Sequence, residues 1–165
     1  MKIAKREDWK TEALPSKRTT IALNRRFSSI DMRKIRMGLV PQQMEDKSFI
    51  FWKRNVKYFH RSWTAHCTYV VRFRNDGDSY LMIEADVNRD PEQYTETSDK
   101  RDAEMILYLV DVLLLHQRAV FPSDGPSSEK QALLKWSQVG RAMFGQHPND
   151  KWITQHCCPG DHGYR

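Results

Sequence analysis

The strongest constraint on the fold lies between residues 48 and 88, where β-prone runs follow one another with almost no connecting sequence. The runs are "SFIFWKR" (48–54), "NVKYFHR" (55–61), "HCTYVVRFR" (66–74) and "YLMIEADVN" (80–88). The first two meet around Arg54 and Asn55, and the last two flank "NDGD", 75–78, in which Asp-Gly tolerates the positive φ of a hairpin turn. Such short connections join antiparallel neighbours. The sequence therefore predicts an antiparallel meander of about four strands.

A sheet with one apolar face needs a cover, and the flanking sequence supplies helices for it. Residues 99–117 are apolar almost all round at helical spacing, which is typical of a buried helix. A second helix is predicted over 129–144. The segment 28–41 fits either a short helix that begins at a Ser28–Asp31 cap or a strand. We therefore predict an α+β fold with two or three helices packed on one face of the sheet.

The positive charge of the chain is concentrated near its N-terminus. The net charge is +6, and residues 1–36 hold eleven Lys and Arg against four acids. We predict a basic, poorly ordered arm over 1–27, one domain over 28–145 and a polar tail over 146–165. Such an arm attracts nucleic acid or an acidic protein surface, or is simply a solvated leader. The arginines expected to make these contacts are Arg18, Arg25, Arg26, Arg33 and Arg36.

Several classes of protein are disfavoured by the composition. The longest apolar run, "MILYLVDVLLL", is about half of what crosses a bilayer, and no apolar signal-peptide core stands at the N-terminus. Three cysteines, two of them adjacent, make a poor disulfide framework. We therefore expect a soluble, cytoplasmic protein without a membrane partner, and the oligomeric state stays open.

The stretch "FHRSWTAHC", 59–67, concentrates chemically versatile side chains at a predicted strand turn. Arginine forks and hydroxyls bind phosphate, and an indole stacks on a base or sugar. The candidates for contact with a phosphorylated ligand are Arg61, Ser62, Trp63, Thr64, Arg72, Arg74 and Arg89. The alternative is a surface hairpin in which tryptophan anchors the packing and arginine pairs with Glu84 or Asp86.

Two histidines in this stretch, His60 and His66, could act as acid and base near neutral pH, or could be satisfied residues at a sheet edge. The sequence carries no Ser/His/Asp spacing, Gly-rich phosphate loop or His-Glu-x-x-His motif. It therefore predicts no catalytic nucleophile and no cofactor.

Two further clusters could hold a metal ion, and neither makes a strong site. The acids Glu84, Asp86, Asp90 and Glu92 can bind a divalent cation, but pairing with Arg72 and Arg74 is the favoured interpretation. The tail holds His156, Cys157, Cys158 and His162, without the Cys-x2-Cys pair that is usual for zinc. No metal is therefore predicted. Asp111, alone in an apolar helix, is expected to bond to an Arg or Tyr.

The runs "KIRMGLVP", "MEDKSFIFWKRNVKYFHRSWTAHCTYVVRF" and "EADVNRDPEQY" resemble a family of small bacterial and phage-type proteins whose activity is not established. The resemblance covers about residues 30–118. Some members of that family are encoded near, or fused to, ADP-ribose-processing proteins such as macrodomains and ADP-ribosylglycohydrolases. The resemblance implies a nucleotide or ADP-ribose-like ligand, and it assigns no catalytic residue.

Three functions remain open at this point. The leading hypothesis is a non-enzymatic binding module for a phosphorylated nucleotide-like ligand or a nucleic-acid backbone. The second is a protein-interaction or inhibitor module, in a conflict between phage and bacterium, that docks on a nucleic-acid enzyme through its arm and sheet face. The third is a nucleotide hydrolase or transferase with His60 or His66 as its base.

Overall fold

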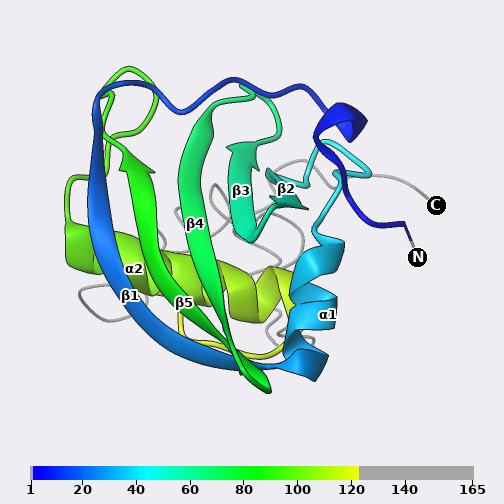
Figure 1. The fold of residues 1–165 in the computed structure, drawn as a ribbon. Helices are drawn as coiled ribbons and strands as arrows, with labels where there is room; N and C mark the ends of the chain where they lie inside the picture. The colour runs from blue at the N-terminus through cyan, green and yellow to red at the C-terminus, as the bar shows by residue number, and fades with distance from the viewer. Residues whose placement is uncertain (1, 123–165) are drawn as a thin grey trace.

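Five antiparallel strands form one open sheet in the computed structural model, which describes residues 2–122 (Figure 1). The strands are β1 (Arg18–Ser28), β2 (Ser48–Lys53), β3 (Val56–Arg61), β4 (Cys67–Asp76) and β5 (Ser79–Asn88). Their order across the sheet is β1-β5-β4-β3-β2, so the strands from β2 to β5 form a meander and β1 pairs with the last of them. The predicted antiparallel α+β architecture is confirmed.

The two tight hairpins form where turn chemistry predicts them. Arg54 and Asn55 join β2 to β3 with φ of 50° and 62°, and Gly77 joins β4 to β5 with φ of 68°. Positive φ at these positions matches the twist of the flanking strands.

The fifth strand comes from residues that we expected in a poorly ordered arm. Arg18–Ser28 instead pairs with β5 along its length, from Arg18 opposite Asn88 to Ser28 opposite Ser79. Contacts with distant parts of the chain stabilise this strand. Ile21, Leu23 and Phe27 enter the core, and their burial outweighs the high local charge.

The helices lie on one side of this sheet. Helix α1 (Ser29–Met37) begins at the Ser28–Asp31 capping box, which settles the ambiguity of that segment in favour of a helix. Helix α2 (Asp99–Leu109) continues directly into a π-helical turn, η2 (Val110–Leu114). The helix predicted over 129–144 lies outside the described residues. None of the helices between residues 2 and 122 is long and apolar enough to cross a membrane.

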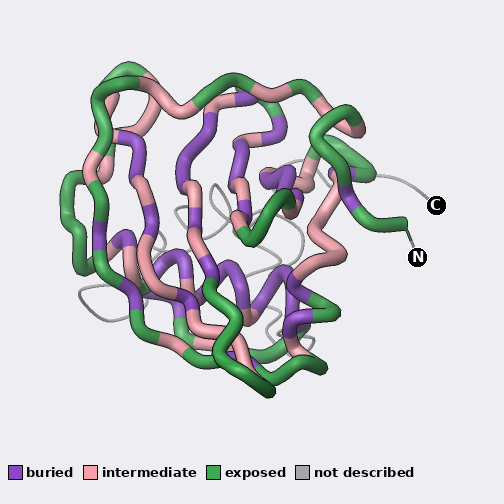
Figure 2. The backbone as a smooth tube through the Cα atoms, viewed as in Figure 1, coloured by how far each residue is buried: buried purple, intermediate pink, exposed green. Residues whose placement is uncertain are grey.

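The main core fills the space between the sheet and these helices. Ile50, Phe59, Val71 and Met82 from the sheet pack with α1 and with Ile106 of α2. We call this side of the sheet the helix face. Figure 2 shows the buried residues of α2 and of the central strands next to one another.

The opposite side, which we call the strap face, is covered by an N-terminal strap, residues 2–17. The strap includes a 3-10 turn, η1 (Arg6–Asp8), and crosses one end of the sheet before it enters β1 (Figure 1). Ala4 packs there with Phe49 and Phe51 of β2, and Trp9 and Tyr58 pack against that small cluster. At the outer edge of β2, Leu39 forms an isolated bridge with Ile50.

A register shift between β4 and β5 changes which side chains share a face. Arg72 lies opposite Glu84, but the next residue, Phe73, lies opposite Met82, so Ile83 is an extra residue in β5. Met82 therefore enters the main core. Strict alternation would have placed Met82 with Glu84 and Asp86, on the other face of the strand.

Candidate functional site

The N-terminal strap is held in place by hydrogen bonds to the end of α1 and to the turn that follows β3. Ala4 donates its N–H to the Met37 carbonyl at 2.8 Å, and Glu12 donates to the Ala65 carbonyl at 3.0 Å. The Trp9 indole donates to the Ser62 carbonyl at 2.8 Å. These bonds hold the strap over β3 and β4 without filling the space beneath it.

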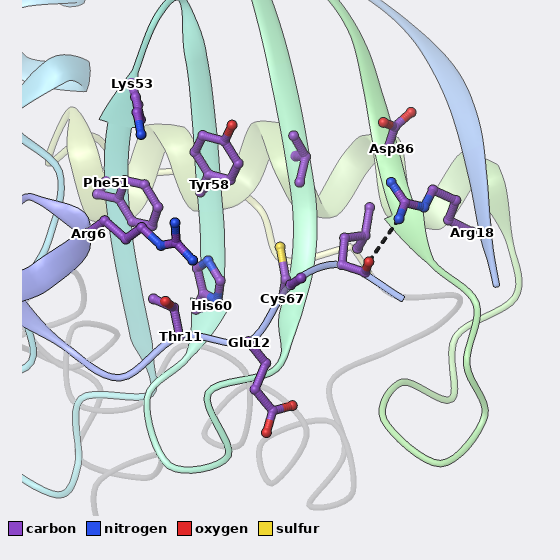
Figure 3. A pocket seen from close by; sticks show the side chains of 13 residues that line it. Arg6, Thr11, Glu12, Arg18, Phe51, Lys53, Tyr58, His60, Cys67 and Asp86 are labelled. Carbon is purple, nitrogen blue, oxygen red and sulfur yellow. Dashed lines mark hydrogen bonds between the residues drawn. The ribbon is translucent and has the colours of Figure 1, made fainter. Parts of the chain in front are cut away.

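The remaining space is a cavity of about 360 Å³ between the strap and the strap face of the sheet (Figure 3). We call it the strap cavity. The strap lines it with Arg6, Thr11, Glu12, Ala13 and Leu14, and the sheet lines it with Arg18, Phe51, Lys53, Tyr58, His60, Cys67, Val70 and Asp86. Its size lies within the range of small-molecule sites in proteins.

One wall of the strap cavity is a ladder of flat rings from β2 and β3. Phe51 stacks on Tyr58 with ring centres 4.8 Å apart and planes 7° apart. Phe51 also stacks on His60, with ring centres 5.7 Å apart and planes 15° apart. Rings held in this way form a rigid apolar surface, of the kind against which a base or a sugar packs.

Only some of the charged side chains around the strap cavity are free to bind a ligand. Asp86 forms a bidentate pair with Arg72 at 2.8 and 2.9 Å, which lowers the pKa of the Asp86 carboxyl to about 2. Glu12 lies 2.7 Å from Nδ1 of His66. Within the described part of the chain, by contrast, the side chains of Arg6 and Lys53 form neither an ion pair nor a hydrogen bond. The third cation of the lining, Arg18, also forms no ion pair but donates to the Leu14 and Pro15 carbonyls. The unpaired charge at the cavity is therefore positive.

His60 has a defined protonation pattern. Its Nδ1 lies 3.0 Å from the Ala65 carbonyl, which can only accept, so Nδ1 carries the proton. Burial and the charge of Arg6 lower the pKa of His60, and together they outweigh the hydrogen bond to Ala65, which raises it. The ring is therefore neutral at pH 7, with an unprotonated Nε2.

The ligand contacts predicted from "FHRSWTAHC" are not brought together. Arg61 lies on the helix face, where it lines a second cavity of about 320 Å³ with Tyr94 and Arg101. Arg72 lies on the strap face, in its pair with Asp86 and in a 2.7 Å contact with Glu84. The two arginines therefore cannot contact one ligand, because Arg61 lies on the same face of β3 as Phe59, a residue of the main core.

The hydroxyls and the indole of the turn are engaged in local bonds. The Ser62 hydroxyl is buried and donates to the Asp46 carbonyl at 2.6 Å. Thr64 is exposed and accepts from the His66 N–H at 3.4 Å. The Trp63 indole donates to the Met44 carbonyl at 2.8 Å and keeps an exposed ring under the Lys47 ammonium. The turn forms as predicted, but as a packed corner of the fold.

The other two predicted ligand contacts lie apart from both the turn and the strap cavity. Arg89 contacts Asp99 at 2.7 Å and the buried Asp102 at 2.6 Å. Arg74 is exposed near the β4–β5 hairpin, beside Asp76. Arg89 thus holds β5 to α2, and Arg74 faces solvent.

The five arginines assigned to the arm also have separate environments. Arg18 donates to the Leu14 and Pro15 carbonyls, both at 2.8 Å. Arg25 forms a bidentate pair with Asp111 at 2.6 and 2.9 Å, which confirms the expected arginine partner of that acid. The remaining three are Arg26, paired with Asp76, Arg36, stacked on Trp52 and Tyr80, and Arg33, exposed on α1.

The acidic cluster of β5 adopts its salt-bridged alternative, since Glu84 and Asp86 both bind Arg72. Residues 2–122 contain no group of His, Cys, Asp or Glu arranged to hold a metal ion. The tail candidates His156, Cys157, Cys158 and His162 lie outside the described residues.

Sequence reasoning missed Arg6 and Lys53 as site residues. Neither stands in a motif, and they are 47 positions apart in the chain. They meet because the strap folds back over β2, which is a tertiary contact without a local signal. Of the predicted functional residues, His60 and Arg18 line the strap cavity.

Comparison with protein-family models, with curated proteins and with solved structures gives no match to the chain. The assignment of a function therefore rests on the geometry of the strap cavity.

Proposed function

We propose that the protein is a non-enzymatic binding module that holds a phosphorylated, nucleotide-like ligand of the ADP-ribose type in the strap cavity. The proposal rests on one observation: two unpaired cations and a stack of aromatic rings line the same cavity. Arg6 and Lys53 form no ion pair with any described residue, and both line a cavity whose wall is the stack of Tyr58, Phe51 and His60.

The charge of the site matches this class of ligand. Two cations balance about two negative charges, which is the charge of one phosphate monoester near neutral pH. A diphosphate diester such as that in ADP-ribose carries a similar charge. The rings supply apolar contact for the base or sugar, and the cations supply charge-assisted hydrogen bonds to phosphate oxygens.

Calorimetric titration with AMP, ADP and ADP-ribose, in low and moderate salt, tests the proposal. Arg6→Gln and Lys53→Gln should each weaken binding about tenfold, because each removes a charged hydrogen bond. Neither change should lower the melting temperature by more than about 2 °C, since neither cation has a described ion-pair partner. Arg33→Gln is the matched control, because Arg33 is an exposed arginine on α1 outside the cavity lining.

Two results would contradict this function. Equal losses of affinity in Arg33→Gln and Arg6→Gln, together with binding that vanishes in moderate salt, would indicate general attraction of anions. Conversion of the nucleotide during incubation, seen by phosphorus NMR, would favour the hydrolase or transferase hypothesis. His60 would then be its base, because only His60 of the two candidate histidines lines the cavity.

The protein-interaction hypothesis is supported by a different observation. The side chains of Trp63 and Met44 are exposed to 54% and 72%, and the indole is bonded to the Met44 carbonyl. Deletion of the N-terminal arm is not a clean test of that hypothesis, because residues 18–27 belong to β1. Trp63→Ser should leave nucleotide affinity unchanged; a loss of affinity would place the turn in the ligand site instead.

A further inference from the structure

We infer that the ligand of the strap cavity is a ribonucleotide whose ribose hydroxyl donates a hydrogen bond to Nε2 of His60. This inference rests on the proposed function, and it adds a chemical requirement that the cations do not impose. Deoxynucleotides also carry a phosphate and a base, so the cations and the rings alone would bind them as well. The unprotonated ring nitrogen is what distinguishes the sugars.

Nε2 of His60 is open to the strap cavity. Within residues 2–122, the one buried side-chain nitrogen or oxygen that lacks a hydrogen bond is Nε of Arg36. His60 is bonded only through Nδ1. Its Nε2 therefore has no protein partner in that part of the chain. Because Nε2 is not among the fully buried atoms that lack a hydrogen bond, it must reach open space. The ring lines the strap cavity, so that space is the cavity. An acceptor therefore points into the binding space.

The position of this acceptor is fixed. The Ala65 carbonyl holds the proton on Nδ1, and the stack with Phe51 holds the plane of the ring. Because β3 places His60 directly on the sheet, the ring cannot turn away without breaking both contacts. A fixed acceptor selects a ligand with a donor at the same place and leaves a buried nitrogen unpaired when the donor is missing.

A sugar hydroxyl is the donor that fits the place of this acceptor. Figure 3 shows the Arg6 side chain extending across the cavity to the His60 ring, and the charge of Arg6 is felt at that ring. The acceptor therefore lies beside a phosphate-binding cation. In a nucleotide the ribose hydroxyls are a few bonds from the phosphate, whereas the amino groups of the base lie at the far end.

The experiment compares AMP, ADP and ADP-ribose with their 2′-deoxy and 3′-deoxy counterparts by calorimetric titration. The wild type should bind the ribonucleotide about fivefold more tightly than one of the two deoxy forms, as expected for one neutral hydrogen bond. His60→Phe keeps a flat ring beside Phe51 and should abolish this preference. The Ala65 carbonyl is not left unpaired in this variant, because it still accepts from the Glu12 N–H.

His66→Gln is the matched control, because His66 contacts Glu12 from outside the cavity lining. This variant should retain the full preference for ribose. A second measurement does not depend on the fold of any variant: nitrogen NMR of the wild type should show the unprotonated Nε2 resonance of His60 moving when AMP is added, and moving less with the deoxy form.

The outcomes separate the two proposals. Nucleotide binding with equal affinity for ribose and deoxyribose, or a preference that survives in His60→Phe, overturns the role of His60 and leaves the proposed function standing. An unchanged Nε2 resonance at saturating AMP does the same. No binding of any of the nucleotides overturns both.

Discussion

Lys57 offers the sharpest test of the energetics of this fold, because it is a charged residue placed in the main core. It lies in β3 on the helix face, is fully buried, and donates to the Ile35 carbonyl in the last turn of α1. Burial lowers the pKa of the Lys57 ammonium from 10.5 to about 7. We therefore expect Lys57→Met, which keeps a long unbranched side chain, to stabilise the protein.

The magnitude follows from linkage between protonation and folding. Between pH 7 and pH 10.5 the unfolded lysine holds a proton that the folded one has released, so the free energy of unfolding rises with pH in this window. Replacing Lys57 at pH 7 removes a cost of about 4 kcal/mol. The lost hydrogen bond to Ile35 offsets about 1 kcal/mol. The expected net gain is about 2–3 kcal/mol.

Urea unfolding of the wild type and of Lys57→Met at pH 7, 8 and 9 measures both quantities. The advantage of the variant should shrink by about 2 kcal/mol from pH 7 to pH 9, because the wild type loses its penalty as the unfolded lysine comes closer to releasing its own proton. The series ends at pH 9 because burial raises the pKa of the Cys67 thiol to about 12, and that group lowers stability at higher pH.

A destabilised Lys57→Met whose deficit is the same at all three pH values would refute this reasoning. It would show that Lys57 stays protonated in the folded protein, and that the carbonyls at the end of α1 stabilise the ammonium by more than its burial costs.

Two further predictions concern stability. Gly38→Ala should lower the free energy of unfolding in urea by more than about 2 kcal/mol, because a Cβ there would lie 2.2 Å from a β2 carbonyl. Gly77→Ala, at a similar φ but in open space, should lower it by about 1 kcal/mol. Equal losses would contradict the steric reason. Asp102→Ala should cost about 3 kcal/mol, because it leaves the largely buried Arg89 without one of its two carboxylate partners and strips the Tyr94 hydroxyl of its acceptor; a loss below about 1 kcal/mol would contradict it.

Local signals were sufficient for most of the sheet. Asn55 and Gly77 are residues that readily adopt the positive φ of a tight turn, so sequence alone located the four strands of the two hairpins. The Ser28–Asp31 cap also predicted the start of α1, although the sequence left a strand as an alternative for that segment. Strand β1 had no such signal, because its pairing with β5 depends on a partner about sixty residues away.

The candidate site was less accessible to sequence reasoning for a related reason. Alternation along β3 places His60 and Arg61 on opposite faces of the sheet, but nothing local indicates which side chain meets the strap cavity. The strap decides that, and its course is fixed by distant bonds such as Glu12 to Ala65. The register shift at Ile83 shows a similar limit, since a single extra residue reverses the face of every side chain beyond it.

The two margins of the sheet have a consequence for the behaviour of the protein at high concentration. An exposed strand edge offers unpaired backbone groups to other chains and can start aggregation. Leu39 takes up the outward N–H and carbonyl of Ile50, near the middle of β2. The opposite margin, β1, is interrupted by a register shift between Ala22 and Arg25 and carries several arginines. Neither margin presents a long, flat, neutral edge, so the sheet resists growth by addition of strands from further copies of the chain.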